Sequence, residues 1–297
     1  SLGVNRIQTV IGIINGTTNY ILTQMTEEGA DFDEVLAEAQ QLGYAEADPT
    51  ADVDGYDAAD KIAILAAIAF NGRIKREEID CEGIRKINAT DISYADDLGF
   101  VIKLLAIAKR GRSPIAKSNA DNDSLQVRVH PTLVSKNHPL ANVNGVYNAI
   151  LVEGDPLGQV MLFGPGAGKG ATASAVVSDI VNIVGFLQTS NATRKLDPML
   201  SCPHDHFKQL TPIAEIDSRF YARFLCQDVP GVIGHLGTSF GKHDVSLESV
   251  VQIGFRDNLA EIVVVTHDVQ EGNFRQALEE IKSLTSIDSI PSILRVL

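Results

Sequence analysis

A polar, aperiodic stretch at residues 188–212, interrupted by Pro198, Pro203 and Pro212, is the feature that most limits how this chain can fold. Polar residues and prolines without a hydrophobic period are typical of a connection between folded units. A chain of 297 residues also exceeds the usual size of one hydrophobic core. We therefore predict a front unit at residues 1–187, a linker at residues 188–212 and a second unit at residues 213–297.

The second unit carries strand and helix patterns in a diagnostic order. Strands are expected at residues 220–227, 245–253, 260–267 and 290–297, and helices at residues 231–242 and 274–284. This βαββαβ order is that of the ferredoxin-like split βαβ unit.

The front unit mixes both kinds of pattern, so its expected fold class is α+β (α/β), a mixed sheet with packed helices. Apolar, β-branched runs predict strands at residues 7–14, 125–134, 147–153 and 159–163. Helical spacing predicts a first helix that ends at Met25, with Thr17 or Thr18 as its N-cap. Further helices are expected at residues 32–41, 57–70, 97–110 and 171–187.

The charge of the chain excludes one class of function. The formal net charge is -13, and no basic run of five or more residues occurs. Nucleic-acid affinity comes mainly from Lys and Arg side chains that neutralise phosphates. We therefore expect no nucleic-acid partner.

Cysteine content and apolar runs indicate where the protein works. The 3 cysteines are far apart and lack metal-ligand spacing, which favours a reducing compartment such as the cytoplasm. The segment Cys202-Pro-His204-Asp-His206 is interpreted as linker, and no metal site is predicted. The longest uninterrupted apolar run, residues 62–70, is too short to cross a bilayer, so no membrane partner is expected.

The start of the chain is abrupt. Residues 1–4 lead almost directly into an apolar run, without an initiator Met or a capping segment. We expect the chain to be part of a longer protein.

The densest chemistry lies at residues 43–61, where six carboxylates precede or begin one helix. One interpretation is structural: acidic groups at a helix N-terminus, plus an exposed Asp57–Lys61 pair worth about 0.3–0.5 kcal/mol. An EF-hand calcium loop is rejected because Lys61 stands where its bidentate Glu belongs. The functional interpretation follows from the apolar residues after Lys61, which predict a partly buried Lys beside a carboxylate, a plausible proton donor.

Two Gly-containing loops and one lysine leave alternatives open. The Gly166-Ala167-Gly168 turn opens a helix, and it either approaches an anion or cofactor or is an ordinary turn. The loop Asp228-Val229-Pro230-Gly231 offers helix N-terminal amides to a carboxylate, or is a plain strand-to-helix turn. Lys103, inside the apolar helix expected at residues 97–110, is a snorkelling lysine or a second active-site amine.

Several linked motifs resemble those of homoserine dehydrogenases. They are Gly12-Ile-Ile-Asn-Gly-Thr-Thr-Asn-Tyr-Ile21, Gly43-Tyr-Ala-Glu-Ala-Asp-Pro49, Asp52-Val-Asp-Gly-Tyr-Asp-Ala-Ala-Asp-Lys61, Gly99-Phe-Val-Ile-Lys-Leu-Leu-Ala-Ile-Ala108 and Gly164-Pro-Gly-Ala-Gly168. Together they cover essentially residues 4–187. The second unit, with Arg219-Phe-Tyr-Ala-Arg-Phe224, Asp228-Val-Pro-Gly-Val232 and Ile262-Val-Val-Val-Thr-His267, resembles an ACT domain.

This resemblance implies the NAD(P)-linked interconversion of aspartate semialdehyde and homoserine. Lys61 matches the family's proton donor, and Asp57 matches the carboxylate that orients it. The remaining matches are Glu46, which holds the substrate amino group, Tyr44, Asp52, Thr17 and Gly16 in the same pocket, and Gly166, Ala167 and Gly168 on the cofactor side.

The resemblance also implies partners and a missing part. Members of the family carry an N-terminal Rossmann domain that binds most of the NAD(P), so we expect this chain alone to be inactive. It implies a homodimer, and an ACT domain that senses an amino acid, with threonine as the expected effector at residues 228–231. Two alternatives stay open: an amino-acid-binding module without catalysis, and a complete dehydrogenase whose cofactor site is residues 164–171.

Overall fold

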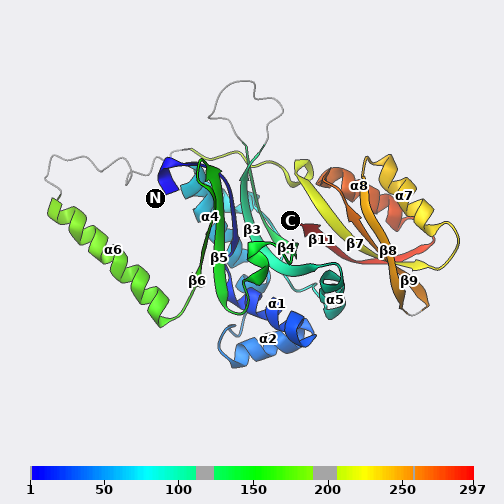
Figure 1. Cartoon of the computed structure of the whole chain (residues 1–297), viewed down its shortest axis with the longest axis horizontal. Coiled ribbons are helices and arrows are strands. Elements are labelled where there is room, and N and C mark those ends of the chain that lie inside the picture. The colour runs from blue at the N-terminus through cyan, green and yellow to red at the C-terminus, as the bar shows by residue number, and fades with distance from the viewer. Residues whose placement is uncertain (1, 112–123, 190–205, 257) are drawn as a thin grey trace, which may run out of the picture.

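The computed structural model describes residues 2–111, 124–189, 206–256 and 258–297. One mixed sheet runs through the molecule in the strand order β6-β5-β1-β3-β4-β11-β7-β9-β8 (Figure 1). Two short strands lie off this path, since β10 pairs with β7 and β2 pairs with β4.

The front unit supplies strands β1 to β6 and helices α1 to α6. The strands are β1 (Arg6–Ile13), β2 (Asp80–Cys81), β3 (Phe100–Arg110), β4 (Leu125–Ser135), β5 (Tyr147–Asp155) and β6 (Gly158–Pro165). The helices are α1 (Gly16–Glu28), α2 (Phe32–Gln41), α3 (Thr50–Val53), α4 (Tyr56–Phe70), α5 (Ala89–Asp97) and α6 (Lys169–Thr189). Short 3-10 helices lie at Leu2–Val4, Arg76–Glu78 and Pro139–Asn142.

The second unit has the predicted ferredoxin-like fold. After a 3-10 helix at Ile213–Glu215, its elements are β7 (Asp217–Gln227), α7 (Val232–Lys242), β8 (Leu247–Arg256), β9 (Leu259–Thr266), β10 (Val269–Gln270), α8 (Glu271–Lys282) and β11 (Ile287–Val296). Within it, the sheet order β11-β7-β9-β8 places the first and last strands side by side.

Strand β11 joins the two units. It pairs antiparallel with β7 and, through Arg295 and Val296, parallel with β4. The second unit therefore extends the front sheet and is not joined to it by the linker alone. The described end of the predicted linker also packs on the front unit, because Leu125 N–H donates to Gln209 O at 3.0 Å.

Two hydrophobic cores hold the elements in place. The larger lies between the front sheet and the helices α1, α2 and α4, and it includes Ile21, Met25 and Ile62. The smaller lies between the second unit's strands and α7 and α8, where Phe220 and Phe274 stack with ring centroids 4.0 Å apart. Tyr221 and Val263 pack into the larger core, so the second unit presents the opposite face of its sheet to the front unit.

The helix predicted at residues 97–110 is wrong. Residues 89–97 form α5 instead, and residues 100–110 form β3, a strand between β1 and β4. A strand covered on both faces is apolar at consecutive positions, so its sequence lacks the alternation that distinguishes a strand from a buried helix.

The N-cap predicted for the first helix is also wrong. Asn15, and neither Thr17 nor Thr18, caps α1, because its side chain accepts a hydrogen bond from Thr18 N–H at 2.9 Å.

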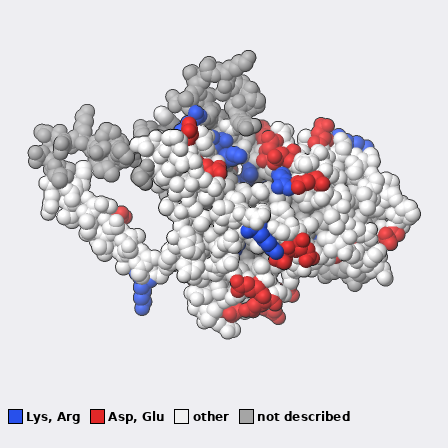
Figure 2. Space-filling view, viewed as in Figure 1, with Lys and Arg blue, Asp and Glu red and all other residues white. Residues whose placement is uncertain are grey.

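Helix α6 projects from the front unit with its apolar side chains exposed. Its exposed residues include Val177, Ile180, Val184 and Leu187. In Figure 2 this arm is almost free of charge, since Lys169 and Asp179 are its charged residues. By length and composition alone α6 could cross a membrane, a property that a search for uninterrupted apolar runs misses because Ser178 and Asp179 divide the sequence.

Candidate functional site

Lys61 and Asp57 form the ion pair that their spacing predicts. Positions four apart lie on one face of α4, and Lys61 Nζ is 2.7 Å from Asp57 Oδ2. Lys61 Nζ also donates to the carbonyl oxygen of Ile14 at 3.2 Å. The lysine is more open than expected, because its side chain is 49% exposed and that of Asp57 is 31% exposed.

Asn15 holds two carboxylates together beside this ion pair. Its Nδ2 donates to Asp52 Oδ1 at 2.6 Å and to Asp57 Oδ2 at 2.9 Å, while its Oδ1 caps α1. Sequence reasoning interpreted Asn15-Gly16 as a strand-ending turn and missed this role. The Lys61 cluster, defined here as Asn15, Asp52, Asp57 and Lys61, therefore combines one ammonium with two carboxylates.

The other carboxylates of residues 43–61 fit the structural interpretation better. Asp54 pairs with Arg85 at 2.5 Å and Asp60 with Arg76 at 2.6 Å. Asp48 accepts a hydrogen bond from Thr50 N–H at 3.1 Å. Asp52 and Asp57 are thus the two carboxylates of this segment that Asn15 holds beside Lys61.

Thr17 and Tyr44 meet beside the start of α1. Thr17 Oγ1 donates to the carbonyl oxygen of Tyr44 at 2.7 Å, and the Tyr44 ring lies 4.9 Å from that of Tyr20. Burial, together with the hydrogen bond to Glu38, raises the pKa of Tyr20 to about 12. Tyr20 therefore stays a neutral donor that ties α1 to α2 beneath this loop.

Glu46 lies on the exposed segment between α2 and α3. Its backbone carbonyl accepts a hydrogen bond from Gln40 Nε2 at 3.0 Å, which fixes the course of the loop. Among the described residues, no hydrogen bond or ion pair joins its carboxylate to the Lys61 cluster. Glu46 is thus available to a ligand from the solvent side.

The side chain of Asn148 lies between Gly16 and the turn Gly166–Gly168. A Cβ atom at Gly166 would lie 1.9 Å from Asn148 Nδ2, so the turn requires glycine there. Gly168 has a φ of +104°, which also favours glycine. Asn148 Oδ1 is buried without a hydrogen-bond partner and lies 3.8 Å from the position of a Gly16 Cβ. Sequence reasoning missed Asn148, which shows no signal in the sequence.

A second candidate site lies in the second unit. The predicted effector residues Asp228, Val229 and Gly231 line a pocket of about 190 Å³, together with Gln252 and Ile262. Gly231 has a φ of +94° and is the N-cap of α7, so the pocket lies at the N-terminus of that helix.

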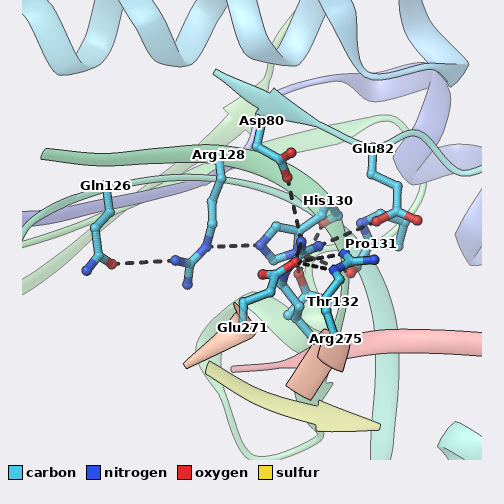
Figure 3. A network of polar contacts seen from close by, with 10 residues as sticks. Asp80, Glu82, Gln126, Arg128, His130, Pro131, Thr132, Glu271 and Arg275 are labelled. Carbon is cyan, nitrogen blue, oxygen red and sulfur yellow. Dashed lines mark hydrogen bonds and ion pairs between the residues drawn. The ribbon is translucent and has the colours of Figure 1, made fainter. Parts of the chain in front are cut away.

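Ion pairs of two buried arginines connect the second unit to the front unit. Arg223 on β7 bonds Asp91 on α5 at 3.0 Å and Glu261 on β9 at 2.7 Å. Arg295 on β11 bonds Glu271 at 2.6 Å and reaches Glu82 of the front unit at 3.4 Å. Figure 3 shows the second group, with Asp80 and Glu82 above and Glu271 and Arg275 below the strand that carries His130. We call both groups together the junction ion pairs.

Comparisons with known proteins agree on the family. The family model for homoserine dehydrogenase matches residues 1–181, and that for the ACT domain matches residues 220–286. A homoserine dehydrogenase from Synechocystis sp. is 66% identical over 297 residues, which are 100% of this chain and 67% of that protein. A crystal structure of a homoserine dehydrogenase from Thiobacillus denitrificans has a TM-score of 0.91 and 37% identity, covering 100% of this chain and 65% of that chain.

A more distant structure holds a cofactor. A hyperthermophilic archaeal homoserine dehydrogenase mutant in complex with NADPH has a TM-score of 0.51 and 31% identity, covering 65% of this chain and 51% of that chain. The chain described here thus spans about two thirds of the length of the Synechocystis and Thiobacillus proteins.

Proposed function

This chain belongs to the homoserine dehydrogenase family, and from that premise we propose that it supplies the substrate-binding and proton-transfer groups for the NAD(P)-dependent interconversion of L-aspartate 4-semialdehyde and L-homoserine. The observation that carries the proposal is the Lys61 cluster. Its ammonium lies 2.7 Å from Asp57 Oδ2, and the Lys61 side chain is half exposed. An ion pair kept only for stability would gain little at such a position.

The chemistry of the reaction matches this cluster. A nicotinamide cofactor, when bound, supplies or accepts the hydride. Addition of hydride to the aldehyde carbon places negative charge on the carbonyl oxygen, which the Lys61 ammonium stabilises and protonates. Asp57 keeps Lys61 oriented, since Asn15 anchors the same carboxylate oxygen.

The substrate's ammonium group explains the excess of carboxylates. We propose that Glu46 binds this ammonium from the exposed loop, with Asp52 facing it from the Lys61 cluster. Gly16, Thr17 and Tyr44 line the remaining wall, where the bond from Thr17 to Tyr44 at 2.7 Å keeps the loop closed on α1. These charges favour an amino-acid aldehyde over a simple aldehyde.

The cofactor is proposed to lie against the Gly166-Ala167-Gly168 turn. Exposed helix N-terminal amides of α6 and the unpaired Asn148 Oδ1 support a polar ligand there. The exposed apolar face of α6 supports a further contact with a nucleotide-binding domain outside this chain, since α6 lies in a chain two thirds as long as its relatives. We expect that domain to bind most of the NAD(P).

We propose a homodimer in the cytoplasm and feedback by an amino acid, with threonine as the first effector to test. The exposed Leu162 and Phe163 on the edge strand β6 support self-association. The pocket of about 190 Å³ at Asp228–Gly231 lies at the N-terminus of α7, a position that suits the carboxylate of an amino acid. Pro230 lies within this loop and fixes its backbone.

The test of the proposed reaction compares two exposed lysines in the full-length protein that contains this chain. Lys61→Met should lower kcat by about 10²–10⁴-fold, the usual contribution of a general acid. Lys75→Met is the matched control, because Lys75 also forms an exposed ion pair, at 2.7 Å from Glu78. Equal kcat values in the two variants would overturn the assignment of Lys61.

A second candidate function is an amino-acid-binding module without catalysis, which the pocket at Asp228–Gly231 favours. Calorimetric titration of this chain with threonine, homoserine and NADPH separates the candidates. Gly231→Leu should abolish threonine binding and leave homoserine binding intact. Binding of threonine without any binding of homoserine would favour the module, and tight NADPH binding would favour a complete dehydrogenase.

A further inference from the structure

Lys103 is a buried ammonium without an acidic partner in contact. It lies on β3 and is 3% exposed. Its three N–H groups meet three neutral oxygens: Val143 O at 2.6 Å, Asn144 Oδ1 at 3.0 Å and Asn19 Oδ1 at 3.4 Å. Among the described residues no carboxylate forms a salt bridge with it, and Glu27 acts on it only through space. Every donor of this side chain is therefore used to hold backbone and amide oxygens.

Such a lysine does not serve stability well. Burial lowers the pKa of Lys103 to about 8, so the charged form is disfavoured in the folded protein. An apolar side chain of similar length fills a core position without this penalty. What Lys103 adds is the fixed geometry of its contacts, two of which hold the segment from Val143 to Tyr147 while the third holds Asn19 on α1.

Asn19 and Thr23 on α1 hold the same segment, and Asn19 shares the Val143 carbonyl oxygen with Lys103. Asn19 Nδ2 lies within 3.1 Å of the carbonyl oxygens of Val143, Gly145 and Tyr147. Thr23 Oγ1 accepts from Gly145 N–H at 3.0 Å. Together with those of Lys103, these contacts hold Val143, Asn144, Gly145 and Tyr147 of the segment 143–147, here called the support loop.

The support loop also contacts the proposed active site. Val146 O lies 3.0 Å from the position that a Cβ of Gly16 would take. The next residue after the loop is Asn148, against which Gly166 packs so closely that a Cβ would lie 1.9 Å from Asn148 Nδ2. The support loop therefore packs against Gly16, the neighbour of Asn15 in the Lys61 cluster. Through Asn148 it also adjoins the turn proposed for the cofactor.

We propose that Lys103 is a positioning residue for the reaction: with Asn19 it fixes the support loop and so sets the spacing between Gly16 and the Gly166 turn, where substrate and cofactor would meet. The proposal rests on the proposed function. A cavity of about 240 Å³, lined by Thr23, Lys103, Lys136 and Asn144, gives the loop room to shift when the lysine contacts are lost.

The experiment compares Lys103→Met with Lys136→Met. Lys136 lines the same cavity but its Nζ bonds Asp96 at 2.6 Å, away from the support loop, so it is the matched control. In Lys103→Met the amide hydrogens of residues 143–148 should exchange about tenfold faster, because the loop loses its anchor. In the full-length protein KM for homoserine and for NADP should both rise about tenfold, more than kcat falls.

Each result decides the proposal. Unchanged exchange and unchanged KM in Lys103→Met would overturn it, as would an equal effect in Lys136→Met. If Lys103→Met does not fold, Asn144→Ala removes one exposed acceptor of the same lysine and should speed exchange at residues 143–148 in the same direction, and no change there would refute the positioning role. If the wild type fails to turn over homoserine, the proposed function fails, while the exchange comparison still decides whether Lys103 fixes the loop.

Discussion

The Lys61 cluster and the junction ion pairs are built from the same kinds of side chain but lie in opposite environments. Lys61 is 49% exposed, and its pair with Asp57 borders solvent. Arg223 and Asp91 are each 1% exposed and join two units of the fold. Because water screens an exposed pair, its charges remain available to a ligand, whereas a buried pair is committed to the fold. Stability and ligand contact are thus assigned to different charged groups.

Removal of Arg223 should have the largest effect on stability. Arg223→Met leaves Asp91 and Glu261 buried without their cation, which should lower the free energy of unfolding by about 3–5 kcal/mol. Urea denaturation measures this change. Arg76→Met is the control, because Arg76 pairs with the exposed Asp60, and a similar loss in both variants would erase the contrast between the two environments.

Acid should weaken the junction through Glu271. Although burial opposes it, the hydrogen bonds and charges of Arg295 and Arg275 hold the pKa of Glu271 below its usual value of 4.5. Its contribution is therefore fully present above about pH 4.5 and is lost as pH falls through the folded-state pKa.

Glu271→Gln tests that contribution. The variant should be less stable by about 2 kcal/mol at pH 7, and the difference should shrink as the pH is lowered below 4.5. Denaturation curves between pH 3 and 7 measure this, and a difference that stays constant with pH would show that the charge of Glu271 is unimportant.

Asn15 should show an intermediate effect, since it belongs to both the fold and the pocket. Asn15→Ala removes the cap of α1, which should cost about 1 kcal/mol of unfolding free energy. It also releases Asp52 and Asp57, so homoserine affinity should fall. Asn88→Ala, which removes the similar cap of α5, should cost as much stability without changing homoserine affinity.

The smallest effect on stability is expected at Lys61. Lys61→Met should change the free energy of unfolding by less than about 1 kcal/mol, because the pair with Asp57 is exposed. Thermal denaturation measures this alongside the activity assay. A loss of several kcal/mol would mean that Lys61 supports the fold, and its effect on turnover would then need no catalytic explanation.

Local patterns in the sequence were sufficient for much of this molecule. Helix α2 begins and ends at the predicted residues, and the Asp57–Lys61 pair follows from helical spacing alone. The βαββαβ order was predictable because its strands and helices have distinct periods and clear turns between them. The strand β3 was not, because burial on both faces removes the alternation that marks a strand.

Contacts between distant residues account for what the sequence could not predict. Asn15 reaches Asp52 and Asp57 only because α4 packs against β1, and Lys103 reaches Val143 only because the segment before β5 packs against β3. The sequence does not distinguish Asn148 from other polar strand residues, and only the fold shows that Gly166 packs against it. The pairing of β11 with β4 is likewise invisible locally, since either strand could have remained an edge. Of the pocket defined above, the charges were predictable and the residues that place them were not.

The shared strand β11 ties completion of the front unit to the order of synthesis. β11 leaves the ribosome after every other strand that the structure describes, so the part of β4 that it pairs with, Thr132 and Leu133 beyond the residues that β2 covers, stays unpaired on that side until that moment. An unpaired edge is a template for association with other chains. A nascent or truncated chain that ends before Arg295 thus leaves this short segment of β4 open to association, even when every residue of the Lys61 cluster is already in place.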